Sequence, residues 1–228
     1  MMNEETPMNE QESLRLITDM IAKAKASHFH EDGTSAILWG SVIGFCGLMS
    51  FAERYFQFDI GFDVWILTLI AIVPQIIISI RESKNRVVKT DLQMAMDAVW
   101  TVYGISIFAM IAYINIIPYS TANLFAQTGI SLFQKNTNGV VAPFRAYALS
   151  SSSLLMILYA FPTLVTGLAR CFKPMIYGAI ACYIFFFISL YTSTTYDNLL
   201  AGMAGISNWL IPGLILRNRY IKGKTANV

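Results

Sequence analysis

The run "AILWGSVIGFCGLMSFA", residues 36–52, decides how this chain folds. Apart from its neutral polar serines it is apolar and uncharged, and its length lies within the range of about 17–25 residues with which a helix crosses the hydrocarbon core of a bilayer. The whole chain has the same bias, since 55% of its 228 residues are hydrophobic, 13% are charged and the mean hydropathy is +0.53. A water-soluble domain of this size needs charges on every exposed face. The composition therefore predicts a protein that is embedded in a membrane.

Five further apolar runs follow, and together with the first they predict six transmembrane helices. The predicted spans cover residues 36–52, 64–80, 98–117, 147–169, 175–192 and 199–216. Backbone N–H and C=O groups in hydrocarbon find no water, so each span must satisfy them internally, as a helix does. The alternation of apolar and polar residues that marks a membrane barrel strand is absent. The predicted fold class is all-α, a polytopic membrane helical bundle.

The distribution of Lys and Arg predicts the orientation of this bundle. Thirteen of the 16 basic residues fall before the first span or after the second, fourth and sixth spans, which places them on one side. The other side holds only Arg54, Lys135 and Arg145. Because short basic loops stay in the cytoplasm, we expect a multi-pass protein with both termini in the cytoplasm.

Two features recur along the spans and suggest three tandem helical hairpins. Each outward-going span opens with an aromatic residue followed by glycine, and each returning span carries one proline before its basic end. These residues are Gly40, Gly104 and Gly178, and Pro74, Pro162 and Pro212. The alternative is coincidence, since Gly and Pro are common in membrane helices. In either case the glycines, with Gly44 in a GxxxG pattern, are candidates for close helix packing, and the prolines are candidates for kinks.

The segment before the first span, "NEQESLRLITDMIAKAKASHF", predicts an amphipathic helix, because Leu14, Ile17 and Ile21 recur at a spacing of three to four residues. The motif His28-x-His30 that follows suggests a metal site as its sharper interpretation. Residues two apart on a helix point away from each other, so we interpret the motif instead as a polar corner at the membrane surface and expect no metal.

These observations divide the chain into four parts. We expect a disordered N-terminus at 1–8, a cytoplasmic amphipathic helix at 9–32, a six-helix transmembrane domain at 33–217 and a basic cytoplasmic tail at 218–228. The transmembrane domain includes an external insertion at about 118–146, which we expect to form a short helix or lid before an Asn-Gly turn.

Ionisable residues are missing from the middle of every predicted span, and Asp97 comes closest, about one turn inside the third. Catalysis and proton-coupled transport in a membrane usually need such groups at depth, so we expect neither an enzyme nor a cofactor. The remaining neutral polar side chains either bond helices together or line a path for a solute. The candidates are Gln75, Ser150, Ser151, Ser152, Ser153, Thr163 and Asn208.

Two functions from different classes fit this pattern. The first is a regulatory, sensor or accessory subunit that acts through helix and lipid contacts. Its predicted partners are the bilayer and, through the N-terminal helix, another membrane protein or a second copy. The alternative is a transporter or channel for a small neutral or amphipathic solute, which requires a continuous cavity lined by the polar candidates. Nucleic-acid binding is not expected, because no recognisable module accompanies the basic loop.

The run "ESLRLITDMIAKAK", the following "AILWG" and the terminal "LIPGLILRNRY" resemble a group of uncharacterised bacterial inner-membrane proteins of this length. The resemblance implies a multi-span helical protein of unassigned function, and it carries no catalytic motif. The layout is also similar to the permease subunits of type-2 ATP-driven exporters, although "TSTTYDN" at 192–198 is too short for their re-entrant hairpin. This second likeness is architectural only.

Overall fold

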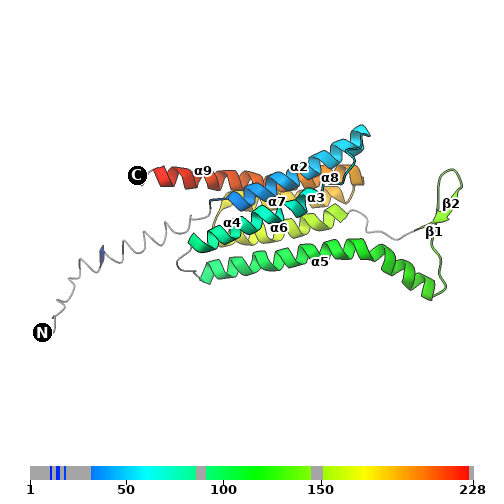
Figure 1. Cartoon of the computed structure of the whole chain (residues 1–228), viewed down its shortest axis with the longest axis horizontal. Coiled ribbons are helices and arrows are strands. Elements are labelled where there is room, and N and C mark those ends of the chain that lie inside the picture. The colour runs from blue at the N-terminus through cyan, green and yellow to red at the C-terminus, as the bar shows by residue number, and fades with distance from the viewer. Residues whose placement is uncertain are drawn as a thin grey trace.

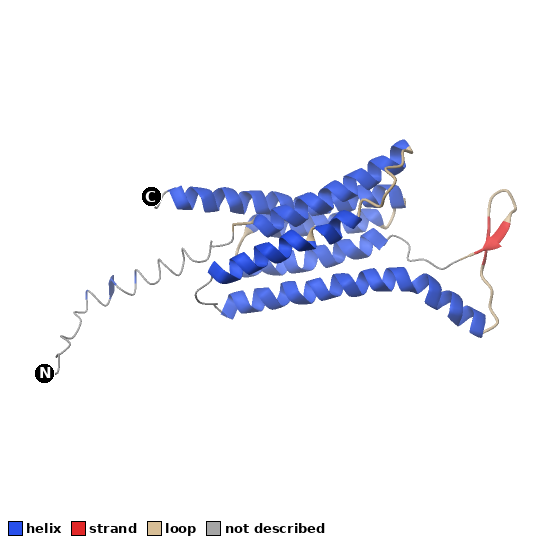
Figure 2. Cartoon of the chain, viewed as in Figure 1, coloured by secondary structure: helices blue, strands red, loops and turns tan. Residues whose placement is uncertain are grey.

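The chain forms a bundle of antiparallel helices in a computed structural model (Figures 1 and 2) that describes residues 32–85, 91–144 and 151–225, together with Gln11, Leu14, Arg15 and Thr18. The elements are α2 (Thr34–Phe56), α3 (Ile66–Ile70), α4 (Ile72–Asn85), α5 (Asp91–Gln127), β1 (Phe133–Lys135), β2 (Val141–Pro143), α6 (Ser151–Ala169), α7 (Lys173–Ser189), α8 (Thr194–Gly205), the π-helix η1 (Ile206–Leu210) and α9 (Ile211–Thr225). Most of the predicted N-terminal amphipathic helix, both histidines and Ser150 lie outside the described residues.

Five helical stretches of the described chain are long and apolar enough to cross a membrane: Thr34–Phe56, Ile66–Lys84, Asp91–Gln127, Ser152–Ala169 and Thr194–Gly223. This confirms an all-α fold with membrane-spanning character. The fifth predicted span corresponds to α7, which is apolar but only 17 residues long.

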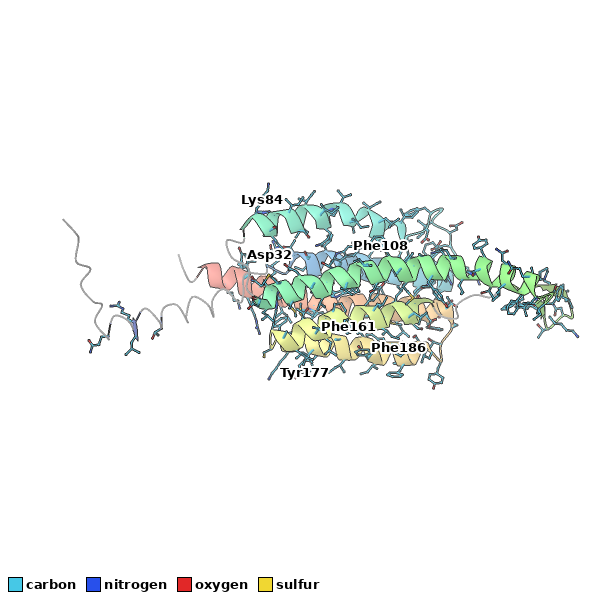
Figure 3. The ribbon with its side chains drawn as sticks, turned by 90° about the horizontal axis from the view of Figure 1, so that it is seen from below. Asp32, Lys84, Phe108, Phe161, Tyr177 and Phe186 are labelled. Atoms are coloured by element: carbon cyan, nitrogen blue, oxygen red, sulfur yellow. The ribbon has the colours of Figure 1, made fainter. Side chains whose placement is uncertain are left out.

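The two ends of the bundle differ in charge. Helices α4, α7 and α9 carry Arg81, Lys84, Lys173 and Arg217 at the end where the chain enters α2, and Figure 3 shows Asp32, Lys84 and Tyr177 there. We call this the basic end. The loop between α2 and α3, the start of α8 and the two strands lie at the opposite end (Figure 1).

An inner group of helices forms the core, and two helices lie outside it. Helix α2 packs most extensively against α8 and η1, and α6 packs most extensively against α7. By contrast, the backbone of α5 approaches only that of α6 among the described elements, and α4 has small contacts with α2 and α3. Three independent hairpins would require α2 to pack mainly on α3 and α4, the helices that follow it. Instead, α2 packs mainly on α8 and η1.

Close backbone approach at glycine explains why α2 and α8–η1 form the centre. Apolar side chains gain little by leaving lipid for one another, so helices associate where small residues let their backbones meet. A methyl group on Gly47 would lie 2.5 Å from Cα of Gly202, and one on Gly40 would overlap the backbone nitrogen of Leu210. Neither contact leaves room for a Cβ.

Helix α5 is longer than any bilayer requires. The predicted third span ends before Pro118, yet the helix runs on through this proline to Gln127 and bends toward that end (Figure 1). A proline removes one hydrogen bond and kinks a helix without necessarily ending it. With 37 residues α5 measures about 55 Å, whereas the hydrocarbon core is about 30 Å thick. Its last turns therefore project beyond the opposite end of the bundle.

The predicted external insertion contains two strands that the sequence did not predict. β1 and β2 pair antiparallel, with Gln134 opposite Ala142. The predicted Asn-Gly turn is present, and Gly139 adopts a φ of 78°, which glycine accepts at no steric cost. The turn chemistry is visible in the sequence, but each strand is only three residues long and too short to show a period.

We expect Gly47→Ala to destabilise the bundle by about 1–3 kcal/mol, the usual cost of forcing an extra methyl group into a packed contact. Gly104→Ala is the matched control, because no described atom lies within 4 Å of the position of its new methyl group. Alanine is the better helix former by about 1 kcal/mol, so the control should be neutral or stabilised. Unfolding in mixed micelles with increasing dodecyl sulfate measures both. Equal shifts would refute the close-contact role of Gly47.

Candidate functional site

Asn208 lies fully buried in η1 and is the centre of a polar cluster inside the bundle. Its Nδ2 donates to the carbonyl oxygen of Tyr159 at 2.7 Å and to Oγ1 of Thr163 at 3.0 Å. The neighbouring Trp209 donates from Nε1 to the same Oγ1 at 2.9 Å. Oδ1 of Asn208 has no hydrogen-bond partner among the described residues. The cluster joins η1 to α6 through three directed bonds.

Pro212 accounts for the π-helical turn that carries Asn208. Proline has no N–H, so the carbonyl of Asn208 lacks the donor it would have in a regular α-helix. The N–H of Ile211 instead bonds to the carbonyl of Ile206, five residues earlier. Such single π turns inside α-helices occur frequently at functional sites, and this one brings two consecutive polar side chains onto Thr163.

Pro162 has a different effect in α6, where the helix continues from Ser151 to Ala169. Two threonines donate to carbonyls next to the proline: Thr163 to Tyr159 at 3.3 Å and Thr166 to Pro162 at 2.7 Å. Threonine hydroxyls commonly satisfy backbone groups near a proline in membrane helices. Thr166 also accepts from Nε1 of Trp100 at 3.2 Å, which connects α5 to α6.

Aromatic rings extend the cluster outward to α5. The ring of Trp209 lies 4.9 Å from that of Tyr159 and 6.2 Å from that of Tyr103, and Tyr103 lies 5.5 Å from Trp100. Tilted and edge-on pairs at these separations are favourable. Since the backbone of α5 approaches only α6, these rings provide much of what attaches α5 to the bundle.

Gln75 connects α4 to α2. Its Oε1 accepts from Nε1 of Trp39 at 3.0 Å, and its Nε2 donates to Oγ of Ser35 at 3.1 Å and of Ser79 at 3.2 Å. Both amide protons are therefore used. Pro74 explains the interruption at Ala71 between α3 and α4, because the carbonyl of Ile70 loses its regular donor.

The serine run joins α6 to its neighbours where its side chains are described. The Oγ atoms of Ser153 and of Ser189 in α7 lie 2.6 Å apart in a hydrogen bond, and both residues are buried. Oγ of Ser152 donates to Oδ1 of Asn198 in α8 at 3.4 Å. Ser151 begins α6, but its side chain, like all of Ser150, is outside the described part of the chain.

The candidate glycines divide into two kinds. Methyl groups on Gly40 and Gly178 would overlap the backbone of η1, and one on Gly44 would lie 2.7 Å from Ile206. Gly104 makes no comparable approach to any described residue, so its predicted packing role stays a prediction. It faces open space on α5, a helix with few neighbours.

Several residues of this centre were missed from the sequence. Gly47, Gly202 and Gly205 form the closest α2–α8 approach, and the Gly-x-x-Gly spacings at 44–47 and 202–205 were a usable signal. Trp209 was a second signal, because an indole N–H in the middle of an apolar span needs an acceptor. The bond between Trp100 and Thr166 had none, since its partners are 66 positions apart.

Chemically, this cluster holds helices together and offers nothing for group transfer. Its members are amides, hydroxyls and indoles, and none pairs a nucleophile with a base. Comparison with known proteins adds no assignment, because no family model, no curated protein and no solved structure matches the chain. Function must therefore be argued from the geometry.

We expect Thr163→Val to destabilise the bundle by about 1–3 kcal/mol, because it leaves buried donors of Asn208 and Trp209 without their shared acceptor. Thr101→Val is the matched control, since the exposed Thr101 donates only to a carbonyl of its own helix. Unfolding in mixed micelles gives both free energies. An unchanged midpoint for Thr163→Val would show that the cluster does not hold η1 to α6.

Proposed function

We propose that this chain is a non-enzymatic, six-span membrane protein that works as a regulatory, sensor or accessory subunit through helix and lipid contacts. In this proposal α7 is the fifth of the six spans, and its 17 residues reach the lower limit of about 17 for a crossing helix.

The uncovered state of α3–α4 and α5 carries the proposal. We compared the 18-residue apolar stretch of each spanning segment by the share of its residues that the chain buries. This share is 6% in Ile66–Lys84 and zero in Asp91–Gln127, whereas it is 44% in Ser152–Ala169 and in Thr194–Gly223. These two segments thus leave much of their apolar surface uncovered by the rest of the described chain. The inner helices form the stable scaffold, and the outer two are the surfaces available to a partner helix or to lipid.

The placement of the candidate polar side chains favours contacts over conduction. A path for a neutral solute needs these groups to face a continuous cavity. Among the described residues, Gln75, Ser152, Ser153, Thr163 and Asn208 instead bond to other helices. The hollow at the opposite end of the bundle is lined by none of them.

The basic end is cytoplasmic in this proposal, and the membrane is the bacterial cytoplasmic membrane. The four cations named there follow the positive-inside rule. Exposed Cys171 provides a native reporter at this end, because Cys46 and Cys182 are buried and donate to carbonyls of Val64 and Met156.

A membrane-impermeant maleimide should label Cys171 in inside-out vesicles but not in intact spheroplasts. Ser131→Cys in a Cys171→Ser background should give the opposite pattern, because Ser131 is exposed in the projecting insertion. Labelling is read as a mass shift. Equal labelling of both positions from one side would exclude this orientation.

Photo-cross-linking from the outer helices tests the contact function. A benzophenone residue at Ile77 of α4 or Ile105 of α5 should give a discrete protein adduct in native membranes, because these side chains are 62% and 65% exposed. Phe187 of α7, also 62% exposed, is the matched control on a core helix and should give lipid adducts only.

Deletion of residues 1–30 provides the second arm, since the predicted N-terminal helix is the other contact surface. We expect an inserted, monodisperse deletion variant to recover less of the same partner. Lipid adducts alone at all three positions, with recovery unchanged by the deletion, would overturn the proposal.

A further inference from the structure

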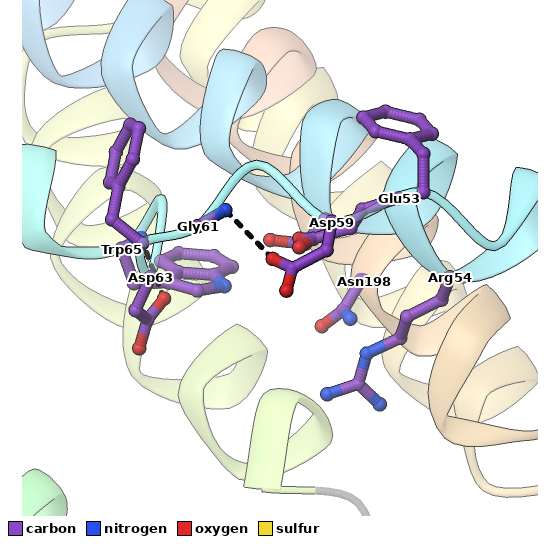
Figure 4. Close-up of a pocket in the computed structure, with 10 residues that line it drawn as sticks. Glu53, Arg54, Asp59, Gly61, Asp63, Trp65 and Asn198 are labelled. Atoms are coloured by element: carbon purple, nitrogen blue, oxygen red, sulfur yellow. Dashed lines mark hydrogen bonds between the residues drawn. The ribbon is translucent and has the colours of Figure 1, made fainter.

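A hollow of about 660 Å³ opens at the end of the bundle opposite the basic end. It is lined by the last turns of α2, the loop that leads to α3 and the start of α8 (Figure 4). Carboxylates and a guanidinium share this hollow, yet no ion pair joins them in the described structure. The hollow therefore contains charges of both signs that the chain itself leaves unmatched.

The last turn of α2 and the loop that follows it supply the acidic side. Glu53, Asp59 and Asp63 each use one carboxylate oxygen to accept a backbone N–H, from Ile60, Gly61 and Trp65. These bonds fix the carboxylates in place. The second oxygen of each has no partner among the residues that the structure describes. Three carboxylates thus line the hollow, and Figure 4 shows Asp63 beside Trp65 and apart from Asp59 and Glu53.

Donors supply the other side. Asn198 is only 6% exposed and lines the hollow. Its Oδ1 accepts from Ser152 at 3.4 Å, while its Nδ2 has no acceptor within the described chain. Because Asn198 lines the hollow, this amide N–H can donate to a group bound there. Arg54 lies next to Asn198 (Figure 4) and adds a guanidinium.

This division of charge selects a zwitterion. A primary ammonium has three N–H donors, which suit carboxylate acceptors, and an aromatic ring beside it adds a cation–π attraction. A guanidinium and an amide N–H suit a phosphodiester oxygen. We propose that the hollow binds the headgroup of a phospholipid that carries a primary ammonium and a phosphodiester.

The surroundings favour a lipid over a free solute. Helix α3 begins directly after Trp65, and its Ile66, Leu69 and Ile70 are exposed. These side chains continue from the hollow toward the hydrocarbon region, where acyl chains would lie. The inference rests on the membrane embedding in the proposed function and adds a defined lipid class to it.

Native mass spectrometry of the purified full chain in micelles tests the inference with dihexanoyl lipids. Phosphatidylethanolamine should bind about tenfold or more tightly than phosphatidylcholine, whose quaternary ammonium donates no hydrogen bond, and than phosphatidylglycerol, which lacks the cation. Arg54→Gln and Asp59→Asn should each weaken the binding of phosphatidylethanolamine about tenfold, because each variant loses a charged hydrogen bond. Both side chains are exposed, so these variants should fold.

Lys135→Gln is the matched control, because it removes an exposed charge at the same end of the bundle but outside the hollow. The affinity of this variant for phosphatidylethanolamine should be unchanged. Equal affinity for the three lipids, or no effect of the two hollow variants, overturns the inference. Equal binding of free O-phosphoethanolamine overturns the lipid assignment. Cross-linking from Ile105 in native membranes separates the two proposals, because a protein adduct there together with no lipid selectivity of the purified chain rejects this inference alone.

Discussion

Helix association in this chain depends on the close approach of α2 to α8 and η1. In lipid, apolar side chains gain little from contact with one another, so a stable seam needs van der Waals contact between backbones and directed polar bonds. Gly40, Gly44 and Gly47 supply the first against a helix that offers Gly202 and Gly205 in return. The bond from Asn208 to Tyr159 is of the second kind, and it joins η1 of this seam to α6. The other inner helices pack around this seam.

The three prolines show how one residue type leads to three structures. Pro74 interrupts its helix near Ala71, Pro162 is accommodated by threonine hydroxyls, and Pro212 is accompanied by a π turn. Proline always removes one donor, but the nearby side chains decide how the freed carbonyls are satisfied. At Pro212 the π turn directs Asn208 and Trp209 to a single acceptor.

The molecule thus combines a rigid inner group with outer helices that have little internal support. Rings of Trp100, Tyr103 and Trp209 attach α5, and the amide of Gln75 attaches α4. A partner or lipid that covers α4 or α5 needs to displace few internal contacts. The hollow at the opposite end is formed by the loop that leads from α2 into α3, so headgroup binding there lies beside one of these uncovered helices.

The sequence by itself determined the membrane class, the helical fold and the approximate positions of the helices, because the bilayer imposes a length and forbids charge in each crossing. It also indicated Gly40 and Gly178 as positions of close helix packing, and Thr163 and Asn208 as polar side chains that bond helices together or line a path. The structure was needed to show that α2 packs on α8, that Gly104 packs on nothing described, and that Asp59 and Asp63 line one hollow with Asn198. The physical reason is that residue types report the solvent around each segment, whereas helix pairing depends on steric fit between residues far apart in the chain.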